Sequence, residues 1–145
     1  MAGCPCGVGT TYSKCCKPII DGVRQAPTAE ALMRARYTAY TKAAVDFILD
    51  THHPEGREEI SRDATEEWAR GSEWLGLEIL NTQGGGETDS SGTVEFSARY
   101  RGEDRAIVTH HEISTFIRDG GRWFFKDAKM VNNPKMRESP KVGRN

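Results

Sequence analysis

The sequence predicts an α+β fold in which helices come first and a four-stranded antiparallel sheet follows. Apolar residues recur with helical spacing between residues 29 and 71, and the pattern changes to alternation after residue 72. Short glycine-rich turns separate the alternating segments, as in consecutive hairpins. Helices that precede such a meander cover one face of its sheet, so we expect the sheet to curl around the first helix.

Length and composition describe one main folded domain with room for a small appendage. The chain has 145 residues, of which 37% are hydrophobic and 28% charged, which is enough apolar material for a core. Acidic and basic residues nearly balance at a formal net charge of −1, so charge does not indicate direct nucleic-acid binding. Because the sequence has neither a membrane-spanning apolar run nor a secretory signal, we expect a cytoplasmic protein without membrane insertion.

Helices are expected at residues 29–42, 45–51 and 63–71. Thr28 precedes the first of them and is suited to cap it. Asp63 and Glu66 have the spacing of a capping box at the start of the third. Strands are expected at residues 75–79, 94–100, 106–118 and 122–129. The last two strands are joined by Asp-Gly-Gly at residues 119–121, a sequence favoured in tight hairpins.

All four cysteines lie within the first sixteen residues, which marks residues 1–20 as a separate small unit. They occur as Cys4 and Cys6, then Cys15 and Cys16, and nearby glycines permit tight turns. Two pairs of thiolates from two turns match the tetrahedral ligand set of zinc, and so short a segment needs such a staple to fold. Disulfides and four free thiols are the alternatives, and disulfides are disfavoured because nothing indicates an oxidising compartment. We therefore expect one structural Zn²⁺ per chain.

This segment resembles the SEC-C motif, a short zinc module at the C-terminus of the SecA translocation ATPase and on assorted bacterial proteins. Residues 4–9, Tyr12, Lys14 and the Cys15-Cys16 pair carry the resemblance.

Two features depart from the SEC-C pattern. Thr10 and Thr11 stand where lysines are frequent, which weakens any basic partner surface. Some relatives have a second copy of the motif, introduced by Gly-Arg-Asn, and this chain ends in Gly-Arg-Asn at residues 143–145. The second copy is therefore either absent or truncated.

The rest of the chain resembles the YchJ-like family of uncharacterised bacterial proteins. The matching segments are residues 26–28, 32–37, 53–54, 73–77 and 121–127. The resemblance implies that residues 27–131 form an NTF2-like (cystatin-like) domain, a bent antiparallel sheet around helices, often with a pocket. That fold serves enzymes, binding domains and scaffolds, so it does not choose a function. The polar residues 132–145 are expected to form a mobile tail.

A candidate pocket combines the first helix with the inner faces of the last two strands. Helical spacing places Arg36 beside the aromatic stripe of that helix, and strand alternation places a carboxylate on each strand. The candidate lining residues are Arg36, Tyr37, Tyr40, Glu112, Ser114, Trp123, Phe125 and Asp127. We expect Arg36 to be buried and bonded to Asp127 or, as second choice, to Glu112. A structural ion pair is the favoured interpretation, and a protonated carboxyl that acts as general acid or base is the alternative.

The adjacent histidines at 52–53 and 110–111 are poor metal sites. Neighbours on a strand point to opposite faces, so at most one histidine of the strand pair could join a site. His53 is expected to end a helix and to bond a local carbonyl.

Two functions remain open. The leading hypothesis is a binding protein whose zinc knuckle recognises a protein or ribonucleoprotein, because four cysteines complete a tetrahedron and leave no position for chemistry. The alternative is a small-molecule-binding protein or enzyme that uses the conical pocket. We expect a non-enzyme, since the sequence lacks the other elements of a catalytic set. It does not indicate the oligomeric state or the identity of a partner.

Overall fold

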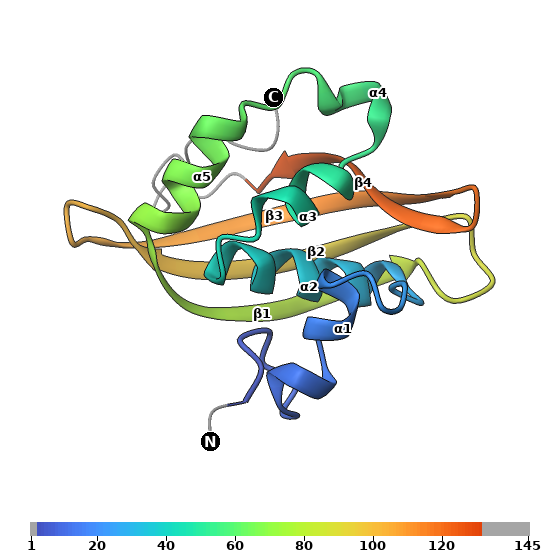
Figure 1. Ribbon diagram of the computed structural model, residues 1–145, viewed down its shortest axis with the longest axis horizontal. Coiled ribbons are helices and arrows are strands. Elements are labelled where there is room, and N and C mark those ends of the chain that lie inside the picture. The colour runs from blue at the N-terminus through green and yellow to red at the C-terminus, as the bar shows by residue number, and fades with distance from the viewer. Residues whose placement is uncertain (1–2, 132–145) are drawn as a thin grey trace.

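The computed structural model describes residues 3–131, in which short helices precede a sheet (Figure 1). A 3₁₀ turn lies at Tyr12–Lys14. The helices are α1 (Lys17–Ile20), α2 (Ala29–Thr41), α3 (Val45–Asp50), α4 (Pro54–Arg57) and α5 (Arg62–Gly71). The strands are β1 (Glu73–Gly84), β2 (Ser91–Arg101), β3 (Ile107–Asp119) and β4 (Arg122–Met130). The expected tail at residues 132–145 lies outside the described residues.

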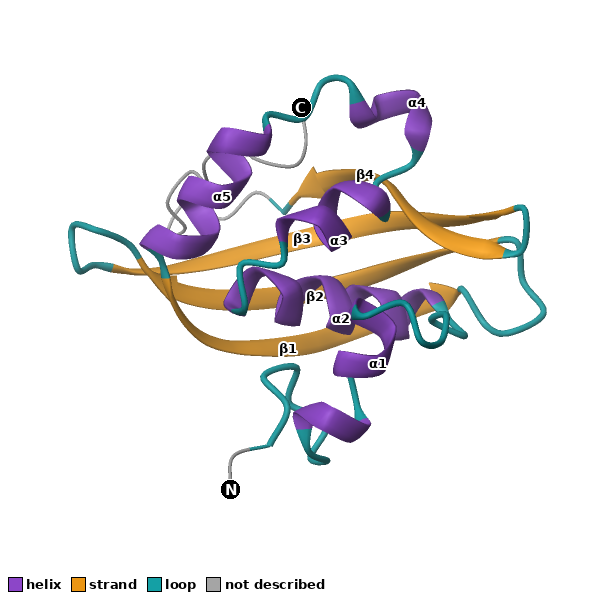
Figure 2. Ribbon diagram, viewed as in Figure 1, coloured by secondary structure: helices purple, strands orange, loops and turns teal. Residues whose placement is uncertain are grey.

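The four strands form one antiparallel sheet in the order β1-β2-β3-β4. Figure 2 shows the helices on one side of this sheet, with α2 lying across it. The predicted α+β class and the antiparallel meander are therefore confirmed.

The tightest connection in the sheet joins β3 to β4. Asp119 pairs with Arg122, so only Gly120 and Gly121 form the loop. Both glycines have positive φ values, 60° and 83°, as a type I′ turn requires and as side-chain-bearing residues rarely adopt. The glycine pair thereby fixes the register of the last hairpin.

Hydroxyl side chains start the two longer helices. The Oγ1 atom of Thr28 accepts a hydrogen bond from the backbone N–H of Ala31 at 3.0 Å and caps α2 as predicted. In α5 the cap is Ser61, whose Oγ accepts from the N–H of Ala64 at 3.0 Å. The expected cap at Asp63 is wrong because the helix already begins at the preceding residue.

The two short helices α1 and α4 are not predicted by the sequence pattern. Each has four residues, too few to display a helical period of apolar residues. In α4 the first residue is Pro54, whose fixed φ suits that position.

The core of the domain lies between α2 and the inner face of the sheet. On β3 the residues from Val108 to Phe116 alternate between buried and half-buried, as predicted. Phe116 and Val94 are fully buried, and Leu32 of α2 is 2% exposed. Burial of each such apolar side chain contributes about 1.5–3 kcal/mol to folding.

The segment between α3 and α4 pairs with the edge of β4 that faces away from β3. The backbone N–H of Phe125 donates to the carbonyl of Thr51 at 2.8 Å, and the N–H of His53 donates to the carbonyl of Phe125 at 2.9 Å. This pairing is parallel and involves residues 51–53 only. It anchors the helical layer to the last strand.

Candidate functional site

The four cysteines converge on one point near the N-terminus. Their sulfur atoms all lie within 4.8 Å of one another. Cys6 is fully buried, Cys16 and Cys4 are 2% and 5% exposed, and Cys15 is half-buried. None of the four takes part in a disulfide.

Two turns bring the cysteine pairs together. The N–H of Cys4 donates to the carbonyl of Thr10 at 2.7 Å, and Gly3 forms a β-bridge with Thr11. Cys15 follows the 3₁₀ turn, to which its N–H donates at 3.1 Å. The chain therefore folds back on itself so that both pairs face inward.

The separations between the sulfurs fit a tetrahedral metal ion. Ligands at the zinc–sulfur distance of about 2.3 Å lie roughly 3.8 Å apart in a tetrahedron. The Sγ atoms of Cys6 and Cys15 are 3.6 Å apart, and those of Cys15 and Cys16 are 3.9 Å apart. Among the described residues, no other group of histidine, cysteine or acidic side chains has metal-binding geometry.

The electrostatics of the cluster also favour a cation. A hydrogen bond from Cys16, with further bonds from Val8, Cys15 and Cys4, lowers the pKa of the Cys6 thiol to about 5 despite its burial. Burial raises the pKa of Cys15 to about 12, and the hydrogen bond to Cys6 raises that of Cys16. Without a cation, protonated cysteines therefore stabilise one thiolate by hydrogen bonds. A bound metal ion would replace the protons of these cysteines.

The knuckle, residues 3–20, packs directly on the larger domain. The Nη1 atom of Arg34 donates to the carbonyl of Cys6 at 2.6 Å, and Sγ of Cys4 lies 3.7 Å from Oγ1 of Thr38. The cysteines and Ile19 form an apolar cluster with Ala35 of α2 and Leu77 of β1. One face of α2 thus serves as the floor of the cysteine cluster.

A second candidate site is a cavity on the other side of α2. Its volume is about 70 Å³. The lining residues are Met33, Arg36, Tyr37, Tyr40, Trp68, Trp74, Phe96, Ala98, His110, Glu112, Ser114 and Phe125. They include six of the eight residues expected to line a pocket.

Arg36 lines this cavity and is 5% exposed. Its Nη1 atom donates to the carbonyl of Ile48 at 2.9 Å and to Oγ1 of Thr51 at 2.7 Å. Its guanidinium carbon lies 4.7 Å from the ring centre of Phe125. Burial lowers the pKa of Arg36, whereas the charges of Tyr40 and Glu112 act in the opposite direction.

Three polar side chains of β3 form a buried row along the cavity. Both oxygens of Glu112 are engaged: Oε1 lies 2.5 Å from Nε2 of His110, and Oε2 accepts from Oγ of Ser114 at 2.7 Å. The carboxylate is therefore central, whereas in a serine–histidine–acid triad the imidazole is central. The row holds a charge in place and does not present an activated serine.

The first-choice partner of Arg36, Asp127, is wrong. Asp127 is exposed because a β-bulge interrupts β4: Phe116 pairs with Phe125 and Thr115 pairs with Asp127, which leaves Lys126 as an extra residue. The bulge reverses the alternation after Phe125 and turns Asp127 outward. Glu112, the second choice, lines the same cavity as Arg36, and its charge acts to raise the pKa of Arg36.

Trp123 also lies outside the cavity. It belongs to the main core, and its Nε1 donates to the carbonyl of Pro27 at 3.2 Å. Its side chain lies on the inner face of the sheet, as predicted. It packs at the end of the core near Pro27 and not in the cavity.

Sequence reasoning missed the aromatic wall that Trp68 of α5 and Trp74 of β1 add to the cavity. Their ring centres are 5.6 Å apart, and those of Tyr40 and Trp68 are 5.3 Å apart. The buried Nε1 atom of Trp68 has no hydrogen-bond partner in the described part of the chain. The only signal in the sequence is two tryptophans six residues apart at a predicted helix-to-strand junction.

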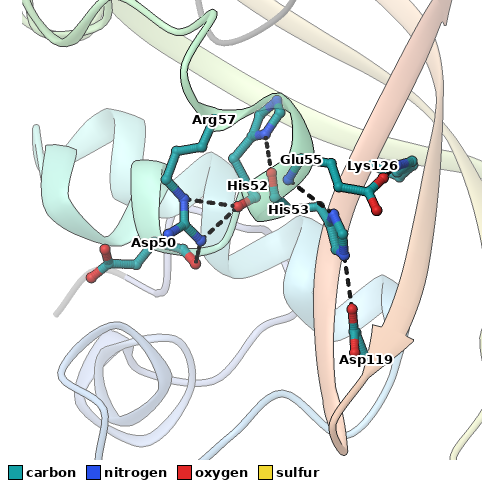
Figure 3. A network of polar contacts seen from close by, with 7 residues as sticks. All are labelled: Asp50, His52, His53, Glu55, Arg57, Asp119 and Lys126. Carbon is teal, nitrogen blue, oxygen red and sulfur yellow. Dashed lines mark hydrogen bonds and ion pairs between the residues drawn. The ribbon is translucent and has the colours of Figure 1, made fainter.

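The histidine pair after α3 belongs to a structural network (Figure 3). Nδ1 of His53 accepts from the N–H of Glu55 at 3.3 Å, and Nε2 lies 2.9 Å from Oδ2 of Asp119. Lys126 donates to Glu55 at 2.7 Å. The expectation that His53 ends a helix by bonding a carbonyl is wrong, because its ring caps the start of α4 and ties this segment to the β3–β4 hairpin.

The histidine pair on β3 points to opposite faces, as expected. His110 is buried beside Glu112, whereas Nε2 of His111 lies 2.7 Å from Glu95 on the outer face. None of the helices in the described part of the chain is both long and apolar enough to cross a membrane.

Comparison with known proteins defines the class of both parts. Residues 28–128 match the family model described as the middle NTF2-like domain of YchJ. The protein is thus a cysteine cluster joined to an NTF2-like domain. The chain belongs to the YchJ-like family of UPF0225 proteins, which confirms the resemblance read from the sequence.

Relatives match over nearly the whole chain. A UPF0225 protein of Geobacter sulfurreducens is 48% identical over 142 residues, which cover 98% of this chain and 87% of the relative. A UPF0225 protein of Corynebacterium efficiens is 45% identical over 84% of this chain and 88% of its own length.

Two solved structures share the fold. The solution structure of RPA3114, a SEC-C motif containing protein from Rhodopseudomonas palustris, superposes with a TM-score of 0.82 at 40% identity and covers 90% of this chain and 100% of that one. The crystal structure of a SEC-C motif containing protein from Psychrobacter arcticus has a TM-score of 0.75 at 30% identity, over 97% and 85% of the two chains. The second superposition extends over nearly the whole chain.

Proposed function

We propose that the protein is an interaction module of the cytoplasm, in which one structural zinc ion shapes the knuckle for a protein or ribonucleoprotein partner. The observation that carries this proposal is the closed set of four sulfur atoms, three of them from buried residues. Four thiolates complete the tetrahedral shell of zinc, so no position is left for a water or substrate. The ion then serves to fix the shape of the two turns.

The tip of the knuckle is the surface best placed for a partner. Residues 7–10 are exposed, and Val8 is an apolar side chain with 53% of its surface accessible. The cysteine sulfurs behind the tip face α2 and β1. A partner would therefore contact the tip and the flanking Lys14, while the metal remains covered.

Metal analysis tests the first half of the proposal. Protein purified under reducing conditions without chelator should contain about one zinc ion per chain, as four thiolates per ion require. Cys6→Ser should lose most of the metal, whereas Ser13→Ala, an exposed change in the same segment, should retain it. Zinc content near zero in the wild type, or unchanged in Cys6→Ser, contradicts the proposal.

Pairs of valine variants test the second half. Val8→Asp places a charge on the knuckle tip, and Val23→Asp places one at an exposed site beyond α1, where the side chain is 78% accessible. Partners captured by the wild type should be retained by Val23→Asp and lost by Val8→Asp, with zinc content equal in all three. Capture before and after ribonuclease treatment separates a protein from a ribonucleoprotein. Identical partner sets for the two variants would refute a role for the tip.

A second candidate function, the binding of a small molecule, is favoured by one feature. The cavity beneath Trp68 and Trp74 combines aromatic walls with the buried charges of Arg36 and Glu112, a combination common in ligand sites.

A further inference from the structure

A further pocket lies between β4 and the segment that contains α4. Its volume is about 130 Å³. Residues 125–128 of β4 line it together with His52, Gly56, Glu59 and Ile60. A cavity of about 150 Å³ accepts a benzene ring, so this pocket has room for a ligand of about five heavy atoms.

The imidazole of His52 offers a hydrogen-bond acceptor to this pocket. His52 is 5% exposed and packs edge-on against Phe125, with the ring centres 5.2 Å apart. Its Nδ1 lies 3.2 Å from the carbonyl oxygen of His53 (Figure 3). Because a carbonyl oxygen can only accept, Nδ1 carries the proton of the neutral ring and Nε2 keeps a lone pair.

The surroundings of His52 keep its ring neutral and leave Nε2 open. Burial lowers the pKa of His52, and the charges of Arg36 and Arg57 act in the same direction. Nε2 has no hydrogen-bond partner among residues 3–131. In that part of the chain, Nε1 of Trp68 is the only fully enclosed side-chain nitrogen or oxygen without a partner. Nε2 of His52 is therefore accessible from the pocket that its ring lines.

Carboxylates make the wall of the pocket negative. Asp127 lines the pocket and has no hydrogen bond or ion pair within the described residues. Glu59 adds a second carboxylate to the lining. Lys126, the one cation of the lining, donates to Glu55 at 2.7 Å. A positively charged ligand would therefore meet two carboxylates and a lone pair in the wall.

The other cations near His52 do not line the pocket. Arg57 donates to the backbone carbonyl of His52 at 2.8 Å, and Arg36 lies over the ring of Phe125. Neither belongs to the lining. Within residues 3–131, only the cysteine cluster gathers ligand atoms closely enough for a metal ion. The separated acceptors of this pocket therefore suit a polyatomic cation.

We propose that this pocket binds a primary alkylammonium group, with N–H donors on Nε2 of His52 and on the carboxylate of Asp127, and with the alkyl chain against Phe125. An ammonium has three N–H donors, which can serve separate acceptors. Lysine side chains and free small amines share this chemistry. The inference goes beyond the functions proposed above and depends on neither the knuckle nor the cavity beneath Trp68.

Butylammonium, which has the size of a lysine side chain, is the probe that tests this proposal. Titration of the full chain, followed by the Nε2 resonance of His52 in long-range NMR spectra, should show saturable binding. Butanol, a donor without the charge, should bind about tenfold or more weakly. Tetramethylammonium, a cation without N–H donors, and butyrate should not compete. Equal binding of butanol, competition by tetramethylammonium, or no saturable shift at His52 overturns the proposal.

Two variants locate the site. Asp127→Asn removes a charge at an exposed position and should weaken butylammonium binding about tenfold. Gly56→Ala acts on the imidazole: a Cβ atom at this position would lie 2.9 Å from Cε1 of His52, so the ring must shift, and binding should weaken. Glu78→Gln, an exposed carboxylate on β1, is the matched control. Wild-type affinity in Asp127→Asn or in folded Gly56→Ala refutes the assignment.

Two further measurements separate the sources of the ligand and the two proposals. Nα-acetyl-lysine amide should compete with butylammonium if a lysine side chain of a partner enters the pocket; failure to compete assigns the pocket to free amines. Val8→Asp should bind butylammonium as the wild type does, since Val8 is not part of the lining. If butylammonium fails to bind the wild type while partner capture is normal, only the pocket proposal falls.

Discussion

The knuckle and the larger domain are held together by different means. In residues 3–20 the buried hydrophobic side chains are Cys4, Cys6, Cys16 and Ile19, so sulfur supplies most of the interior. In the larger domain aromatic and aliphatic side chains from α2 and all four strands form a continuous core. The comparison teaches that the same helix can complete two interiors, because one face of α2 covers the cysteines and another covers the cavity.

Removal of the metal should produce the largest difference between the two regions. Binding of structural zinc supplies about 10–16 kcal/mol in zinc-finger peptides, and the knuckle has little apolar core to replace it. With a strong chelator, amide hydrogen exchange should become fast in residues 3–20 and stay slow in β2 and β3. Loss of protection throughout the sheet is the contrary outcome, and it would show that the knuckle is integral to the core.

Substitution of Arg36 tests the interior of the larger domain. Arg36→Ala removes charge-assisted bonds to Ile48 and Thr51 and the contact with Phe125. The free energy of unfolding should therefore fall by about 2–4 kcal/mol. Asp127→Asn changes an exposed carboxylate and should alter stability by about 0.5 kcal/mol or less. Urea melts of both variants provide the measurement. A comparable loss in Asp127→Asn would contradict the outward position that the bulge gives Asp127.

The smallest expected effect lies at the contact between the two regions. Arg34→Ala removes the partly exposed hydrogen bond to the carbonyl of Cys6. The folded knuckle should be destabilised by about 1 kcal/mol, and its metal affinity should fall about fivefold. Glu30→Ala removes the ion pair that Glu30 forms with Nε of the same Arg34, but it keeps the bond from Arg34 to Cys6 and should leave metal affinity nearly unchanged. Competition with a chromophoric chelator measures both. Equal effects of the two variants would assign the contact to helix stability instead.

The elements with many alternating or periodic residues were predictable from the sequence. The third strand, with its inward row from Val108 to Phe116, and the helix that begins after Thr28 follow from local patterns. The bulge at Lys126 did not follow from any local pattern, because it depends on how β4 pairs with β3. One inserted residue was enough to misplace Asp127.

Much of the cavity lining was predictable, but its completion was not. Arg36, Glu112 and Ser114 were found from the spacing on one helix and one strand. Trp68 and Trp74 belong to elements that no sequence rule brings together with α2, and His110 was considered only as a metal ligand. Contacts between distant elements depend on packing, which spacing along a single segment does not reveal.

The pairing of residues 51–53 with β4 has a consequence for association between molecules. An edge strand of a sheet offers unpaired amide and carbonyl groups to other chains, and natural proteins cover such edges. Thr51 and His53 cover part of the edge formed by β4. At the opposite edge the knuckle lies against Leu77 of β1. A chain that loses its metal would therefore uncover β1, and self-association should begin at that strand.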